Sequence, residues 1–240
     1  INVYQNGDRR SLCFGNAVEQ SGMSLADPSL LLFNYTRAMM LGAVLAPDLR
    51  RTLVLGLGGG SLARALHAHF PHCRITAVEL RAAVVEVART WFALPADARL
   101  GVYVGDAAGY LTDRCPRAGL IFADLYDSEG MHEQLLNPGF FGLCRQALTG
   151  HGVAVFNLWS GRHFRDLAIN DAIDVAFDNQ VLRLAVPGRN RIVFGFADAV
   201  PELRRQDFRD LVQQLGLRLG APLLAACDQL WAQNPDLLRD

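Results

Sequence analysis

The sequence predicts an α/β fold built on a doubly wound, mostly parallel sheet. Residues 52–125 repeat a pattern of strand, turn and helix. Each predicted strand in this part is a nearly continuous apolar run, as a parallel sheet covered by helices on both faces requires. With 240 residues, of which 51% are hydrophobic, the chain is also long enough to bury the core of such a sheet.

Residues 1–47 predict a small β unit followed by a lead-in helix. The dipeptide Asn6-Gly7 favours a type I′ turn and lies between segments that suit strands, so residues 1–15 predict a β-hairpin. Over residues 31–42, apolar side chains recur at helical spacing, and Pro47 ends this predicted helix.

Residues 48–200 predict the main domain. Its first four strands are expected at residues 52–57, 75–80, 101–106 and 119–125, with helices after the first three and a long loop after the fourth. A helix at residues 140–148, a strand at 152–159 and a helix at 163–177 complete the repeating part.

The domain is predicted to end in an antiparallel edge. Two strands, at residues 180–187 and 191–197, are separated by the tight turn signal Pro187-Gly188. Such an ending is typical of S-adenosylmethionine-dependent methyltransferase folds, whereas a plain dinucleotide-binding sheet more often continues with another crossover. Residues 201–240 predict helices that pack on the same domain.

Composition excludes several classes of function. The net charge is −1 and the arginines are scattered, which argues against nucleic-acid binding. The chain has no lysine, so Schiff-base, pyridoxal phosphate and Walker-type phosphate chemistry are excluded. No apolar run approaches the roughly 20 residues that span a bilayer. Five dispersed cysteines without a CxxC pair are typical of reduced, buried thiols, so we expect a cytoplasmic protein.

No metal site is predicted. His67, His69 and His72 lie close together in the sequence, but their HxHxxH spacing places them on different faces of a helix end.

A glycine turn followed by an acidic strand end predicts a nucleoside site. Gly56, Gly58 and Gly60 come after the first buried strand and before a helix, where glycine lets the backbone approach a ligand. Glu79 ends the second strand, where its carboxylate can accept hydrogen bonds from both ribose hydroxyls. The alternatives are glycines that serve only close packing and a solvated glutamate at a strand end.

Acidic residues also end the third and fourth strands. Asp106 can accept from the exocyclic amine of adenine while the backbone of Ala107 meets a ring nitrogen, but Asp106 is equally suited to cap the following helix. Asp124 and Asp127 can bind a cationic amine and take its proton, because an amine must be deprotonated before it attacks the carbon beside a sulfonium. The alternative for this pair is Asx turns or capping.

Taken together, these motifs resemble the spermidine synthase (polyamine aminopropyltransferase) family, and within it the bacterial spermidine synthase-like branch. The resemblance covers about residues 11–196. The stretches that carry it are RSLCFGNAVEQSGM, FNYTRAMM, RRTLVLGLGGGSLAR, ITAVEL, VGDAAGYL, FADLYDSEG, FFGLCRQALTGHGVAVFNL and RIVFGF.

The resemblance implies transfer of an aminopropyl group from decarboxylated S-adenosylmethionine to an amine or polyamine, with release of methylthioadenosine and without a metal. It also implies a homodimer in which the N-terminal β unit pairs with a second subunit. The implied site comprises Glu79 at the ribose, Leu80 beside it in the donor site, Asp106 and Ala107 at the adenine, Asp127 as catalytic base, Asp124 at the amino groups, and Gln20, Tyr35 and Tyr126 at the substrates.

Three departures from the family pattern keep other functions open. Gly59 stands where the family's GGGDGG run has its donor-selecting Asp, the loop reads DLYDSEG instead of Asp-Ser-Ser/Thr-Asp-Pro, and the tyrosine of a Pro-Thr-Tyr-Pro stretch has no counterpart in LAVPGRNR. One alternative is a methyltransferase that uses S-adenosylmethionine, although Val54 stands where such enzymes usually carry an acid. The other is a nucleoside-binding homologue without catalysis.

Overall fold

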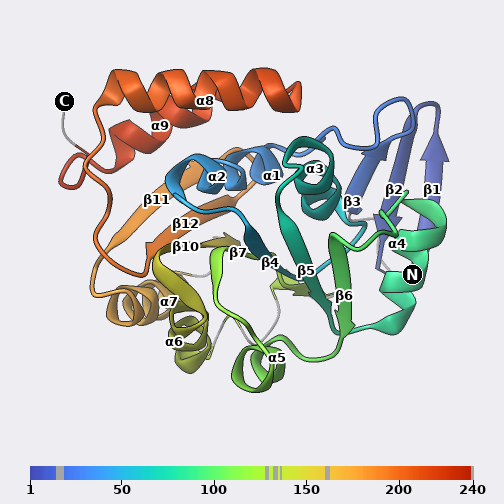
Figure 1. The fold of residues 1–240 in the computed structure, drawn as a ribbon, viewed down its shortest axis with the longest axis horizontal. Helices are drawn as coiled ribbons and strands as arrows, with labels where there is room; N and C mark the ends of the chain where they lie inside the picture. Colours follow the sequence, from blue (N-terminus) through green and yellow to red (C-terminus); the bar gives the residue numbers. More distant parts are fainter. Residues whose placement is uncertain (15–18, 128–129, 132–134, 136, 160–162, 239–240) are drawn as a thin grey trace.

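The computed structural model describes residues 1–14, 19–127, 130–131, 135, 137–159 and 163–238. Figure 1 shows one large twisted sheet between two layers of helices, with a smaller sheet beside it. The large sheet has seven strands in the order β11-β12-β10-β7-β4-β5-β6. These strands are β4 (Arg51–Leu55), β5 (Arg74–Glu79), β6 (Leu100–Val104), β7 (Ala118–Ala123), β10 (Leu148–Trp159), β11 (Val181–Val186) and β12 (Asn190–Phe196).

The connectivity is the predicted doubly wound one. Strands β4, β5, β6, β7 and β10 are parallel, while β12 runs antiparallel to both of its neighbours, β10 and β11. The chain leaves β4 in one direction along the sheet and returns on its other side at β7, so a crevice opens between the carboxyl ends of β4 and β7. The predicted fold class, with its antiparallel ending, is therefore confirmed.

Helices cover both faces of the sheet, as Figure 1 shows. On β7, Leu120 and Phe122 belong to one core and Ile121 and Ala123 to the other, because successive side chains of a strand point to opposite faces. One face is covered by α1 (Asn34–Met39), α2 (Gly42–Leu45), α3 (Ser61–His69), α8 (Arg205–Leu219) and α9 (Leu224–Gln233). The other face is covered by α5 (Ala107–Asp113), α6 (Pro138–Gln146) and α7 (His163–Ala176).

The N-terminal β unit is a three-stranded antiparallel sheet and not only a hairpin. The predicted pair β1 (Asn2–Asn6) and β2 (Arg9–Cys13) is joined by β3 (Glu19–Ser24), which we did not predict. The segment EQSGMS contains few residues that favour strands, so only its pairing with β2 identifies it. The turn also lies one residue later than expected, at Gly7 and Asp8, since Asn6 pairs with Arg9.

The lead-in helix differs from the prediction as well. It is divided into α1 and α2, because the backbone between them makes i→i−3 hydrogen bonds, from Leu41 to Ala38 (3.1 Å) and from Ala43 to Met40 (3.0 Å). Gly42 opens α2 where a Cβ would lie 2.5 Å from a methyl group of Val155, so the helix needs glycine to pack on β10.

The loop after β7, the helix after β5 and the C-terminal helices complete the fold. The loop expected after the fourth strand contains a short antiparallel pair, β8 (Tyr126–Asp127) and β9 (Gly130–Met131). Helix α4 (Ala82–Trp91) packs between the two sheets, with Val84 in a small core shared with the N-terminal sheet. Helices α8 and α9 pack in the same hydrophobic core as Leu120 and Phe122 of the sheet. The division at residues 47 and 200 stays a prediction.

Candidate active site

A cavity of about 660 Å³ lies at the carboxyl edge of the main sheet. The ends of β4, β5, β6 and β7 form its floor, and residues of β2, β3 and α1 form the opposite wall. The N-terminal sheet is therefore part of the site. Of the residues predicted for the site, those that line the cavity are Gln20, Tyr35, Gly56, Gly58, Glu79, Leu80, Asp106, Ala107, Asp124 and Tyr126.

The glycine turn after β4 brings two of its three predicted residues to the cavity. Gly56 has a φ of 88°, and a Cβ there would lie 2.2 Å from the carbonyl oxygen of Asp124, so this turn needs glycine to pass close to β7. Gly58 lines the cavity with a φ of 52°. Gly60 lies outside the cavity wall, and a Cβ there would meet a methyl group of Leu94 at 2.7 Å, which points to close packing.

Gly59 also lies outside the cavity wall. Its backbone N–H donates to the Ser21 hydroxyl at 3.0 Å, and a Cβ at Gly59 would lie 2.9 Å from the Cβ of Ser21. Position 59 is thus closed by β3, and a carboxylate there would not fit without a shift of that strand. The role of position 59 in donor selection stays a prediction, and the neighbouring Gly58 is the residue that lines the cavity.

Glu79 connects the end of β5 to the glycine turn. Its carboxylate accepts hydrogen bonds from the backbone N–H groups of Leu57 (3.1 Å) and Arg81 (3.0 Å), and the residue is 7% exposed. Leu80 beside it is 52% exposed and lines the cavity. The predicted ribose ligand therefore also holds the turn in place, a role that its position in the sequence did not indicate.

Asp106 caps helix α5. Its Oδ2 accepts a hydrogen bond from the backbone N–H of Gly109 at 2.7 Å, so the capping interpretation holds. Asp106 and Ala107 also line the cavity beside the end of β6. An adenine contact by these residues stays a prediction.

Asp124, just after the end of β7, contributes an acidic group to the cavity floor. The Nδ2 of Asn157 donates to its Oδ1 at 2.8 Å, and the Tyr35 hydroxyl forms a second hydrogen bond. Burial raises the pKa of Asp124 from its ordinary value of 3.8 to about 6, although both hydrogen bonds oppose this shift. At neutral pH the group is a carboxylate that lacks a described cationic partner, which suits the binding of an ammonium ion.

The aromatic residues predicted at the substrates lie around Asp124. Tyr35 on α1 stacks on Phe33 with 5.7 Å between the ring centroids. Burial, and then the charge of Asp124, raises the pKa of both Tyr35 and Tyr126, so both hydroxyls stay protonated at neutral pH. The backbone of Asp127 belongs to β8, but its side chain lies outside the described residues.

Sequence reasoning missed several residues of the site. Asn157 and Asn190 form hydrogen bonds next to Asp124, and Ser21 holds the glycine turn. One signal was available: Asn157 is a polar residue near the carboxyl end of an otherwise apolar strand run, which is unfavourable unless the amide has partners. Neither Ser21 nor Asn190 is distinguished by the residues around it in the sequence.

Arg64 supports the glycine turn from behind. The residue is 3% exposed, and its guanidinium donates to the carbonyl oxygens of Pro28 (2.7 Å), Phe92 (2.9 Å) and Gly59. Burial lowers the pKa of Arg64 from 12.5 to about 10, so it stays charged at neutral pH. This side chain connects α3 with the turn, with the end of α4 and with the segment before α1.

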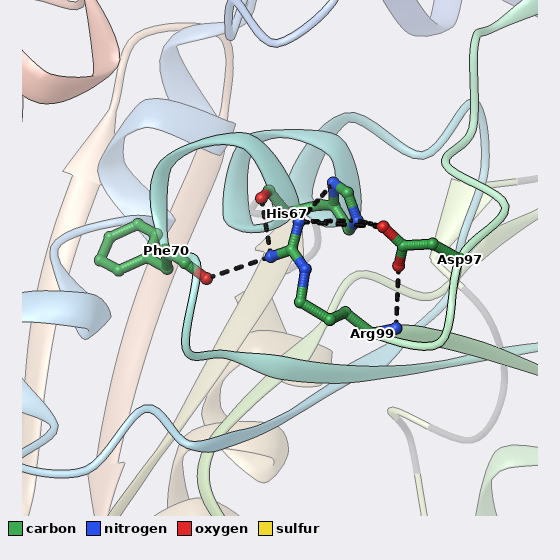
Figure 2. Close-up of polar contacts among 4 residues, drawn as sticks. All are labelled: His67, Phe70, Asp97 and Arg99. Atoms are coloured by element: carbon green, nitrogen blue, oxygen red, sulfur yellow. Dashed lines mark hydrogen bonds and ion pairs between the residues drawn. The ribbon is translucent and has the colours of Figure 1, made fainter.

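The histidine cluster lies away from the cavity. His67 contacts Asp97 with 2.7 Å between Nε2 and Oδ2, and Arg99 donates to the carbonyl oxygens of His67 and Phe70, as Figure 2 shows. These contacts join the end of α3 to the segment before β6. His69 contacts Ser29 instead. Within the described residues, no group of three His, Cys, Asp or Glu side chains is arranged to hold a metal.

Comparison with known proteins gives the family. Residues 32–170 match the model of the Spermine/spermidine synthase domain. A polyamine aminopropyltransferase of Neisseria meningitidis is 31% identical over 240 residues, which cover 98% of this chain and 90% of the relative. The chain belongs to the spermine/spermidine synthase family. This family member is accordingly a transferase.

Solved structures agree with the fold of this spermine/spermidine synthase family member. A probable spermidine synthase from Corynebacterium glutamicum has a TM-score of 0.71 at 21% identity, over 92% of this chain and 88% of that one. Human methyltransferase-like protein 13, solved in complex with SAH, has a TM-score of 0.69 at 25% identity, over 79% of this chain and 94% of that one. Among the helices described in this family member, none has the length and apolar character needed to cross a bilayer.

Proposed function

We propose that this enzyme transfers an aminopropyl group from decarboxylated S-adenosylmethionine to an amine acceptor. The observation that carries the proposal is Asp124, a carboxylate on the floor of the same cavity that the glycine turn and Glu79 line. The polyamine aminopropyltransferase relative supports the same reaction class. The turn, Glu79 and Leu80 would hold the nucleoside, with Asp106 and Ala107 at its base.

The reaction requires a neutral amine and a sulfonium carbon. The acceptor nitrogen attacks the methylene carbon bonded to sulfur, the carbon–sulfur bond breaks, and its electron pair remains on sulfur as methylthioadenosine leaves. The proton lost by the nitrogen goes to a base, for which we propose Asp127 on the evidence of the family resemblance alone. Asp124 would bind and orient the ammonium group, with Gln20, Tyr35 and Tyr126 in contact with the substrates.

The charges of the cavity wall support a decarboxylated donor. The described wall contains two cationic side chains, Arg9 and Arg81. The Arg9 guanidinium forms an ion pair with Glu19, and that of Arg81 lies 3.9 Å from the Glu79 carboxylate. The α-carboxylate of intact S-adenosylmethionine would therefore compete with Glu19 and Glu79 for these cations, in a cavity that also contains the carboxylate of Asp124. A donor without that carboxylate avoids this repulsion.

Calorimetry with methylthioadenosine, S-adenosylmethionine and decarboxylated S-adenosylmethionine tests the donor. Tighter binding of the decarboxylated compound is expected.

Turnover with diamines and polyamines then tests the reaction: Asp127→Asn should abolish transfer while methylthioadenosine binding changes little. Asp113→Asn, on an exposed residue of α5, is the matched control. Loss of methylthioadenosine binding in Asp127→Asn would contradict the assigned role, and binding without turnover over the whole amine panel would favour the non-catalytic alternative.

A methyltransferase is the second candidate, because methyltransferase-like protein 13 has a similar structure. Against it, Val54 is buried within β4, where it offers no polar contact to a ligand. Transfer of a labelled methyl group from S-adenosylmethionine to any amine substrate would favour this candidate over aminopropyl transfer.

Two further expectations remain proposals. Tyr4 on the outer strand β1 is 57% exposed, which supports a homodimer formed through the N-terminal sheet, and light scattering of the purified protein tests it. The five cysteines are free, which supports a cytoplasmic location.

A further inference from the structure

A chain of amide side chains leads from β12 to Asp124. The Nδ2 of Asn190 donates to the Oδ1 of Asn157 at 2.9 Å, and the Nδ2 of Asn157 donates to the Oδ1 of Asp124 at 2.8 Å. Asn157 is 1% exposed, so both ends of its amide are used inside the protein. Asn190 is the first residue of β12 and follows the turn in the stretch LAVPGRNR.

The chemistry of these groups allows only one orientation of the two asparagine amides. An ionised carboxylate only accepts hydrogen bonds, so Asn157 must turn its NH2 group toward Asp124. The oxygen of the Asn157 amide then faces Asn190, which must donate to it. If the Asn157 amide were reversed, its oxygen would face the carboxylate, and this repulsion would favour protonated Asp124.

Two tyrosines enclose the same group. The Tyr126 hydroxyl donates to the backbone oxygen of Asn157 at 3.3 Å and also forms a hydrogen bond with the Asn190 side chain. Tyr35 reaches Asp124 from α1. The described titratable groups that face Asp124 are therefore these two hydroxyls, from α1 and β8, while β10 and β12 contribute the uncharged amides of Asn157 and Asn190.

We propose that Asn190, acting through Asn157, is a positioning residue that keeps Asp124 ionised and oriented toward the ammonium group of the substrate. The inference rests on the proposed function, because the ammonium is that of an aminopropyl donor or amine acceptor. It assigns a role to the stretch in which the family's tyrosine has no counterpart. The asparagine pair acts on the carboxylate and need not touch the reacting atoms.

Three variants test the series of hydrogen bonds from Asn190 through Asn157 to Asp124. Asn190→Asp keeps the shape but replaces the donating NH2 by an acceptor, and Asn157→Leu removes the donor to Asp124 at similar volume. Asn179→Asp is the control, because Asn179 is exposed, lies outside the cavity and has a φ of 61° that Asn and Asp both tolerate. If Asn190→Asp does not fold, Asn190→Ala removes the amide without adding a charge.

The first measurement is the NMR titration of the Asp124 carboxyl carbon in the ligand-free protein. Asn157→Leu and Asn190→Ala should raise the pKa of Asp124 by at least about one unit, because the donor to the charged form is removed or is no longer oriented, and Asn190→Asp should raise it further because it also adds a negative charge. The acid limb of kcat/KM for the amine should move in the same direction, with at least an about tenfold loss at pH 7. Methylthioadenosine affinity should stay within about threefold.

The outcomes separate the two proposals. A titration of Asp124 that is unchanged in a folded Asn190→Asp or Asn190→Ala protein overturns the positioning role, and so does an equal shift in Asn179→Asp. If the unmodified enzyme transfers no aminopropyl group to any amine, the proposed function fails, but the carboxyl titration still decides whether Asn190 controls Asp124.

Discussion

At the scale of single residues, Asp124 contributes to the way in which the stability of the protein depends on pH. The pKa of its carboxyl is raised from 3.8 to about 6, mainly by burial. The folded protein therefore retains this proton at a pH where the unfolded chain has lost it, so the contribution of Asp124 to the free energy of unfolding of the ligand-free protein falls as the pH rises from 3.8 to about 6.

Asp124→Asn should remove this dependence. We expect the variant to be more stable than the original protein at pH 8, by up to about 2 to 3 kcal/mol, and equal to it near pH 4. Thermal unfolding at the two pH values measures the difference, with Asp113→Asn as the control. A variant that is less stable than the original protein at pH 8 would show that the carboxylate makes favourable contacts beyond those described.

Alanine substitutions at two glycines distinguish a glycine that close packing requires from one that only makes the backbone more flexible. Gly56→Ala should destabilise the protein by more than about 2 kcal/mol, because the φ is 88° and the added Cβ would meet the carbonyl of Asp124 at 2.2 Å. Gly142→Ala, inside α6 with open space around it, should instead stabilise by about 0.5 to 1 kcal/mol. Urea unfolding of both variants checks the contrast, and equal effects would refute it.

At the scale of elements, Arg64 joins three segments that lie far apart in the sequence. Arg64→Ala should cost about 3 kcal/mol, because the carbonyls of Pro28, Gly59 and Phe92 lose a buried donor. Since Gly59 belongs to the turn, methylthioadenosine binding should also weaken. Unfolding and calorimetry measure both effects. Arg89→Ala on the exposed side of α4 is the control, and comparable losses there would contradict the assignment.

Helices and strands were predicted well where a periodic pattern of apolar residues is long, and poorly where contacts with neighbouring elements determine the structure. The strands of the main sheet are apolar runs, so their positions could be predicted within a few residues. Strand β3 has no such run, and its pairing with β2 makes it a strand. The helical spacing of residues 31–42 records neither the i→i−3 hydrogen bonds that divide the predicted helix into two nor the close approach of Gly42 to Val155.

At the scale of the whole molecule, a ligand in the cavity should link the two sheets. The wall contains Gln20 and Ser21 of β3 as well as Gly56 and Gly58 after β4. Methylthioadenosine at about 100 times its Kd should stabilise the protein by about 2.7 kcal/mol. Hydrogen exchange should slow in residues 19–24 and 56–60 together, and by more than in α8 and α9, which contribute no residue to the wall and are protected only through the stabilisation of the whole fold. Protection confined to residues 56–60 would show that β3 takes no part in binding.

The sequence by itself determined the α/β fold and the edge of the sheet where ligands bind, because both depend on local periodicity and on residues that end strands. It also identified Glu79, Asp106 and Asp124 at that edge. Only the tertiary structure showed that Gly59 and Gly60 lie close to Ser21 and Leu94, and that Asn157 and Asn190 form a series of hydrogen bonds to Asp124. Burial and hydrogen bonding of these groups depend on strands that are distant in the sequence, so no local pattern records them.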